Sequence, residues 1–95
     1  MRGEEVRRFG TKGLEPNQIH GPRSINCTIN DEIIVVGRYV QIWNLAGELL
    51  RVFGTRGELF LPTAAALVSE PNLVVVTDSS LRRVIVLENQ DAATQ

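Results

Sequence analysis

RRFGTKG at residues 7–13 returns as RVFGTRG at residues 51–57, 44 positions further along the chain. Short runs rich in β-branched residues lie between and after the two copies. A period of about 40–45 residues with several short strands in each repeat is typical of the blades of a β-propeller. The 95 residues hold two such repeats, at about 10–53 and 54–88, followed by a polar tail at 89–95. Two blades do not close a ring, so the sequence predicts either part of a larger propeller or a chain that closes by assembly.

Eight short strands are predicted from alternating or continuous apolar runs of about five residues. They cover residues 6–9, 24–29, 33–36, 39–43, 49–53, 64–68, 73–77 and 83–87. If the strands of an antiparallel blade are labelled A to D from the ring axis outward, the all-β chain reads D-ABCD-ABC. The D strand of one copy complements the ABC set of another, and three copies would make a closed ring of six blades. A segment of a longer, six-bladed propeller would show the same strand order.

Three motifs in the second repeat point to a family. They are GELFLP at 57–62, LVVVTD at 73–78 and RRVIVL at 82–87. The second repeat resembles the NHL repeat, with its glycine-phenylalanine-proline start, its valine-alanine-aspartate strand end and its arginine-isoleucine-valine strand start. The first repeat departs from this pattern, because Gly37 stands in place of the aspartate and Tyr39 in place of the arginine. The resemblance implies a six-bladed propeller that binds proteins or single-stranded RNA, often beside a ubiquitin-ligase tripartite motif.

Asp78 and Arg83 flank one loop of the second repeat, and the first repeat lacks both. If they form a partly buried ion pair, the loss of either one alone would leave an unpaired charge, which explains their joint absence. We therefore predict a structural role for this pair.

The formal net charge is -1, from 10 basic and 11 acidic residues, but the predicted topology separates the charges. The end with the D-to-A and B-to-C loops carries the candidate ligand-binding residues Lys12, His20, Arg23, Arg38, Tyr39, Arg56 and Arg82, interleaved with Glu15, Glu58 and Asp78. The opposite end is predicted to be acidic with almost no basic partner, and it carries Asp31, Glu32, Glu48, Glu70, Glu88 and Asp91.

We interpret the basic end as the face through which a non-catalytic module binds a protein or peptide partner. The alternative is single-stranded RNA, with Lys and Arg contacting phosphates while Tyr39 and His20 stack on bases. The sequence contains no serine-histidine-acid set and no close carboxylate pair, so no enzyme activity, cofactor or metal site is predicted. A metal held by three copies of His20 at a ring axis remains the remote alternative.

Individual residues give further expectations. Cys27 is the single cysteine, so no internal disulfide can form, and its strand-like surroundings predict a small buried side chain. Trp43, matched by Leu87, is expected to pack between blades rather than serve recognition, and Phe9, Phe53 and Phe60 are core candidates. No secretory signal and no apolar run of about 20 residues is found, which predicts a cytoplasmic protein without a membrane partner.

Overall fold

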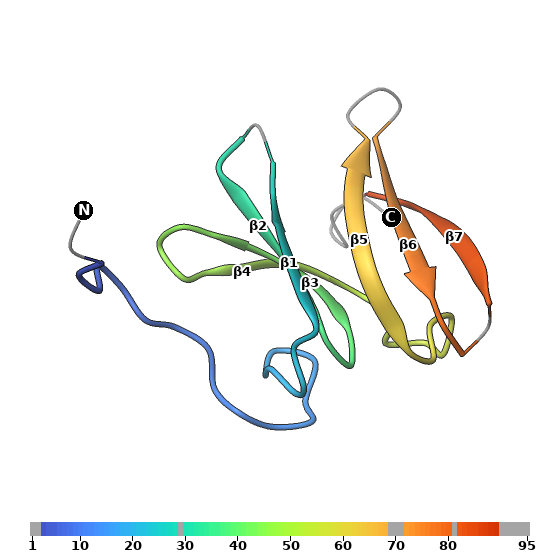
Figure 1. The fold of residues 1–95 in the computed structure, drawn as a ribbon, viewed down its shortest axis with the longest axis horizontal. Coiled ribbons are helices and arrows are strands. Elements are labelled where there is room, and N and C mark those ends of the chain that lie inside the picture. Colours follow the sequence, from blue (N-terminus) through green and yellow to red (C-terminus); the bar gives the residue numbers. More distant parts are fainter. Residues whose placement is uncertain (1–2, 29, 69–71, 81, 90–95) are drawn as a thin grey trace.

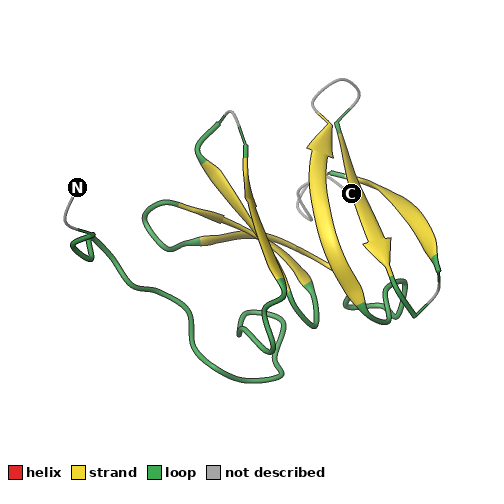
Figure 2. Ribbon diagram, in the orientation of Figure 1, coloured by secondary structure: helices red, strands yellow, loops and turns green. Residues whose placement is uncertain are grey.

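The computed structural model describes residues 3–28, 30–68, 72–80 and 82–89. Its strands are β1 (Ser24–Cys27), β2 (Glu32–Val36), β3 (Val40–Asn44), β4 (Leu49–Phe53), β5 (Pro62–Val68), β6 (Leu73–Asp78) and β7 (Arg83–Glu88). They form a four-stranded sheet in the order β1-β2-β3-β4 and a three-stranded sheet in the order β5-β6-β7 (Figure 1). All pairs are antiparallel, and Figure 2 shows strands and loops but no helix among the described residues. Within the described ranges, no helix is long and apolar enough to cross a membrane.

The seven strands predicted from residue 24 onward are confirmed, with ends that differ from the expected bounds by at most two residues. The predicted strand at residues 6–9 is wrong for a single chain, because these residues lie in no strand and Val6 is 89% exposed. A strand requires a neighbour that accepts and donates its backbone hydrogen bonds. The expected neighbour of residues 6–9 is an open ABC set, and β7 lies at the opposite end of the molecule from the first described residues (Figure 1).

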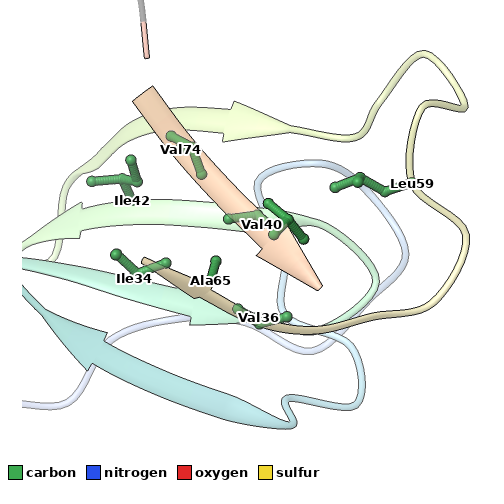
Figure 3. Close-up of a cluster of buried hydrophobic side chains, with 8 residues drawn as sticks. Ile34, Val36, Val40, Ile42, Leu59, Ala65 and Val74 are labelled. Carbon is green, nitrogen blue, oxygen red and sulfur yellow. The ribbon is translucent and has the colours of Figure 1, made fainter. Parts of the chain in front are cut away.

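The two sheets pack face to face through alternating apolar side chains. The core consists of Ile34, Val36, Val40, Ile42, Leu59, Ala65, Val74 and Val76. Figure 3 shows the cluster and labels all of these residues except Val76. On β2 and β3 the core residues are two positions apart, and successive side chains of a strand point to opposite faces. One face of the first sheet therefore meets the second sheet, and Leu59 in the connection between them completes the contact.

The other face of the first sheet is covered by the N-terminal segment. Gln41 is buried there, and its side-chain amide donates to the carbonyl oxygens of Pro16 at 2.9 Å and Gln18 at 2.7 Å. The buried ring of Trp43 lies against Phe9, with ring centroids 5.1 Å apart. The packing role expected of Trp43 is thus confirmed, although its partner is the N-terminal segment rather than the second sheet.

Two expectations about single residues are wrong. Cys27 is exposed, because the side chain of the preceding Asn26 is the one that turns toward β5 and donates to the carbonyl oxygen of Ala65 at 3.5 Å. Asn89, expected to begin a polar tail, is buried, and its side-chain and backbone nitrogens donate to Asn72 at 2.9 Å and 3.0 Å. Residues 90–95 of the predicted tail lie outside the described residues.

Truncation of the core is expected to be costly. Ile42→Ala should lower the free energy of unfolding by about 2–5 kcal/mol, because it leaves a cavity where the sheets meet. Chemical denaturation followed by Trp43 fluorescence, at one fixed protein concentration, measures the change. The control Leu45→Ala lies in an exposed turn and should change it by less than about 0.5 kcal/mol. Equal losses in the two variants would contradict the assigned core.

Candidate binding face

Four segments gather at one end of the two sheets, the lower end in Figure 1. We call this end the loop face, and it consists of residues 10–22, the β2–β3 turn (37–39), the β4–β5 connection (54–61) and the β6–β7 turn, described at 79, 80 and 82. The backbone N–H of Arg38 donates to the carbonyl oxygen of His20 at 3.2 Å, which joins the first two segments. The backbone N–H of Ser79 donates to the carbonyl oxygen of Leu61 at 3.1 Å, which joins the other two. The predicted grouping of these loops at one end is therefore present.

Arg38 and Tyr39 form the centre of the first half of the loop face. The guanidinium carbon of Arg38 lies 5.6 Å from the centroid of the Tyr39 ring, within reach of a cation–π interaction. The Arg38 Nε also donates to the Tyr39 hydroxyl at 3.2 Å, and that hydroxyl donates to the carbonyl oxygen of Leu14 at 3.2 Å. The exposed side chains of Lys12 and His20 lie in the adjoining segment. Four of the predicted site residues are thus brought into two contacting segments.

The second half of the loop face carries Arg56, Arg82 and an exposed aromatic ring. Both arginines are exposed, and the backbone N–H of Arg56 donates to Glu58 Oε1 at 2.9 Å. Phe60 is 72% exposed, so its expected place in the core is wrong. Leu59, one residue earlier, fills the core instead.

Arg23 acts as a link between the two sheets. Its Nη1 donates to the carbonyl oxygen of Gly37 at 3.5 Å and to that of Pro62 at 3.3 Å. Gly37 follows β2 in the first sheet, whereas Pro62 begins β5 in the second. The guanidinium predicted to bind a ligand is therefore engaged in holding the two halves of the loop face together.

Asp78 fixes the backbone in the second half of the loop face. It is buried, and its Oδ2 accepts hydrogen bonds from the backbone N–H groups of Phe60 at 2.7 Å and Leu61 at 3.0 Å. Hydrogen bonds to an ionised carboxylate are stronger than those between neutral groups. The register places Arg83 directly opposite Asp78, as the predicted ion pair requires. The backbone contacts of Asp78 were not anticipated, since no local sequence pattern reports which distant N–H groups a carboxylate will meet.

In the first sheet the loop accepts a hydrogen bond at the corresponding place, whereas in the second sheet it donates. A Cβ on Gly37 would lie 2.6 Å from the carbonyl oxygen of His20, so no side chain fits at this position. His20 precedes Phe60 by 40 residues, the offset at which Pro22 matches Pro62. In the second sheet a carboxylate accepts from this part of the loop, whereas in the first sheet the loop carbonyl accepts from the Arg38 N–H. The replacement of aspartate by Gly37 is thus explained by a closer approach of the two backbones.

The opposite end of the sheets contains a pocket of about 380 Å³. Most of its lining is polar, and it consists of Asn26, Cys27, Thr28, Asn30, Glu32, Arg51, Ala66, Leu67, Asn72 and Asn89. Two of the lining residues, Glu32 and Arg51, form an ion pair at 3.1 Å. The expectation of an acidic end with almost no basic partner is therefore wrong at Glu32. Arg51 was not predicted at this end because it belongs to strand β4, whereas the charge prediction assigned loop residues. Glu70 and Asp91 lie outside the described residues.

Among residues 3–28, 30–68, 72–80 and 82–89, no group of three or more His, Cys, Asp and Glu side chains is placed to hold a metal ion. Comparison of the chain with protein-family profiles and with curated protein sequences finds no match. The class that the structure defines is an all-β protein of two packed antiparallel sheets.

Removal of the Asp78 carboxylate should destabilise the protein strongly. Asp78→Ala leaves two N–H groups without their charged acceptor, and we expect a loss of about 2–4 kcal/mol in the free energy of unfolding. Glu58→Ala is the matched control, since its carboxylate accepts from one exposed N–H, and its loss should stay below about 0.5 kcal/mol. Similar losses in both variants would refute the role given to Asp78. Arg83→Ala, alone and combined with Asp78→Ala, measures the coupling of the two residues, and a coupling near zero contradicts the predicted ion pair.

Proposed function

We propose that this chain is a non-catalytic interaction module, an NHL-like propeller segment whose loop face binds a protein or peptide partner. The observation that carries the proposal is the exposure of large apolar side chains on the loop face. Phe60 is 72% exposed and Leu14 is 56% exposed, each on a different connection of that face. Large exposed apolar patches rimmed by polar residues mark interaction sites, and these two side chains would supply the apolar part of such a patch.

The surroundings of these side chains support a peptide ligand. Leu14 is fixed through its carbonyl oxygen by Tyr39, over whose ring Arg38 lies, and the Phe60 backbone is fixed by Asp78. Aromatic and arginine side chains dominate the binding energy of protein interfaces, and little ordering cost remains when they are already held. Exposed cations flank the apolar groups, so the fitting partner is an extended segment that combines apolar and acidic side chains.

The same contacts favour a peptide over RNA. Single-stranded RNA is bound by open aromatic faces and by cations that are available for phosphates. On the loop face Arg38 lies over the Tyr39 ring, and Arg23 donates to two backbone carbonyl groups. Glu15 and Glu58 are exposed on the same loops and oppose the approach of phosphates. RNA binding is the alternative that the salt titration separates from peptide binding.

The fold supports the propeller assignment in its connectivity. Both sheets are meanders in which sequence neighbours pair, and they lie face to face in the order in which the repeats occur. This is the arrangement that successive blades adopt in a propeller.

Selection of a displayed random peptide library on the 95-residue chain tests the proposed function. Enriched peptides should bind wild-type protein in fluorescence polarisation, and Phe60→Ser or Arg38→Ala should weaken them about tenfold or more. Leu45→Ser is the matched control for Phe60→Ser, because Leu45 is also a large exposed apolar side chain but lies in the β3–β4 turn, and it should leave binding unchanged. Failure to enrich peptides, or equal losses in the control, would argue against a peptide site on the loop face.

Salt dependence separates the two ligand classes. A labelled single-stranded RNA of mixed sequence is titrated at several salt concentrations under the same conditions. We expect weak RNA binding and peptide affinities that fall far less steeply with salt than phosphate-mediated RNA binding does. RNA affinity that falls steeply, by about a thousandfold between about 50 mM and about 200 mM salt, would replace the peptide proposal with the RNA alternative.

A further inference from the structure

The N-terminal segment is folded like the connection between the two sheets. Gly10 and Gly54 have nearly equal positive φ angles, 96° and 95°. A Cβ on Gly10 would meet Ile19 Cδ1 at 2.6 Å, and one on Gly54 would meet Leu59 Cδ1 at 2.9 Å. Ile19 precedes Leu59 by 40 residues, the same offset as the two prolines that follow them. Residues 10–19 therefore reproduce, before the first sheet, the connection that enters the second sheet.

Phe53 and Phe9, which come directly before the two connections, also occupy corresponding places. Phe53 ends β4 and packs against the core between the sheets, as does Leu87. Phe9, its counterpart in the repeat, stacks on Trp43, which is the counterpart of Leu87. The residues that precede Phe53 form a strand, whereas residues 6–8 form none. The N-terminal segment is thus arranged as the end of a strand that belongs to a preceding sheet.

In the described residues, the second sheet has three strands, one fewer than the first sheet. In the described residues β3 is paired on both edges, with β2 and β4, whereas β7 is paired only with β6. Val84 and Val86 on β7 are 60% and 55% exposed, although their counterparts Val40 and Ile42 on β3 are fully buried. An exposed strand edge with apolar side chains is a surface that pairs with another chain.

We propose that a second copy of this chain occupies this edge. Its residues 6–9 add to β7 as an antiparallel fourth strand, and its first sheet covers Val84 and Val86, as the second sheet covers Val40 and Ile42 within one chain. The β3–β4 pairing supplies the register through the repeat. It pairs Val84 with Phe9 of the second copy and Val86 with Arg7.

The geometry of a single chain excludes the same contact within one molecule. Phe9 is held on the first sheet by Trp43, and β7 lies at the far end of the 39 Å long axis (Figure 1). Each copy then has one donor strand and one acceptor edge, so the association is head to tail. Such an interface closes into a ring when the rotation allows it, and three copies form the six-sheet ring predicted from the repeat.

Engineered disulfide bonds test the register. In a Cys27→Ser background, Arg7→Cys with Val86→Cys places two thiols at directly opposed positions, whose Cα atoms lie about 4.5–5.5 Å apart in an antiparallel pair. Both side chains are exposed, and within one chain the change at Arg7 removes the hydrogen bond that its Nη1 donates to the carbonyl oxygen of Leu45 at 2.8 Å. Oxidation should convert most of the protein to covalent species of more than one chain on non-reducing gels. The control Arg7→Cys with Val84→Cys is displaced by two residues, beyond the about 7 Å that a disulfide spans, and should remain mostly uncrosslinked.

Light scattering on a sizing column tests the strand itself. Wild-type protein should have one discrete mass that corresponds to two or more chains of 10.5 kDa each. Successive N–H groups of a strand point to opposite edges, so one of the two groups, that of Arg7 or that of Arg8, faces β7. Substitution of that residue by proline removes its hydrogen bond to β7 and should reduce the mass to one chain. Arg7→Ala keeps the N–H and should keep the oligomer. A monomeric wild type, proline variants that both remain oligomeric, or equal cross-linking of the control pair would each overturn the proposal.

Discussion

The contact between the two sheets is the interaction on which the rest of the molecule depends. Ile34, Val36, Val40 and Ile42 of the first sheet form one buried cluster with Ala65, Val74 and Val76 of the second sheet and with Leu59 of the connection. Each fully buried aliphatic side chain contributes about 1.5–3 kcal/mol, and each of these small sheets has one apolar face that needs a cover. Because the contact fixes the sheets face to face, it also brings their connecting loops to one end.

Two different sets of hydrogen bonds hold the backbone of the loop face, one in each sheet. In the second sheet the buried Asp78 accepts from the N–H groups of the incoming loop, and in the first sheet Gly37 lets the loop carbonyl approach the Arg38 N–H. Arg23 then joins the two halves. The exposed side chains available for a partner stand on backbone that is held by buried polar contacts, which is the arrangement that lowers the ordering cost of binding.

The two ends of the chain differ in what they leave uncovered. The first sheet is covered on one face by the second sheet and on the other by residues that include Phe9 and Gln18. The second sheet is covered on one face, and its β7 carries exposed valines. A repeat chain with this asymmetry satisfies its interior contacts but not its terminal ones, which is why repeat proteins need capping elements or further copies.

The sequence by itself determined the strands from residue 24 onward and their meander order, because short apolar runs and an internal repeat are local properties. It also indicated the packing of Trp43 and the grouping of basic loops at one end. The tertiary structure alone decided the positions of Cys27, Phe60, Arg23 and Arg51, and the absence of a strand at residues 6–9. Each of these depends on which face meets a distant neighbour, or on whether a hydrogen-bonding partner is within reach, and a residue pattern does not encode that information.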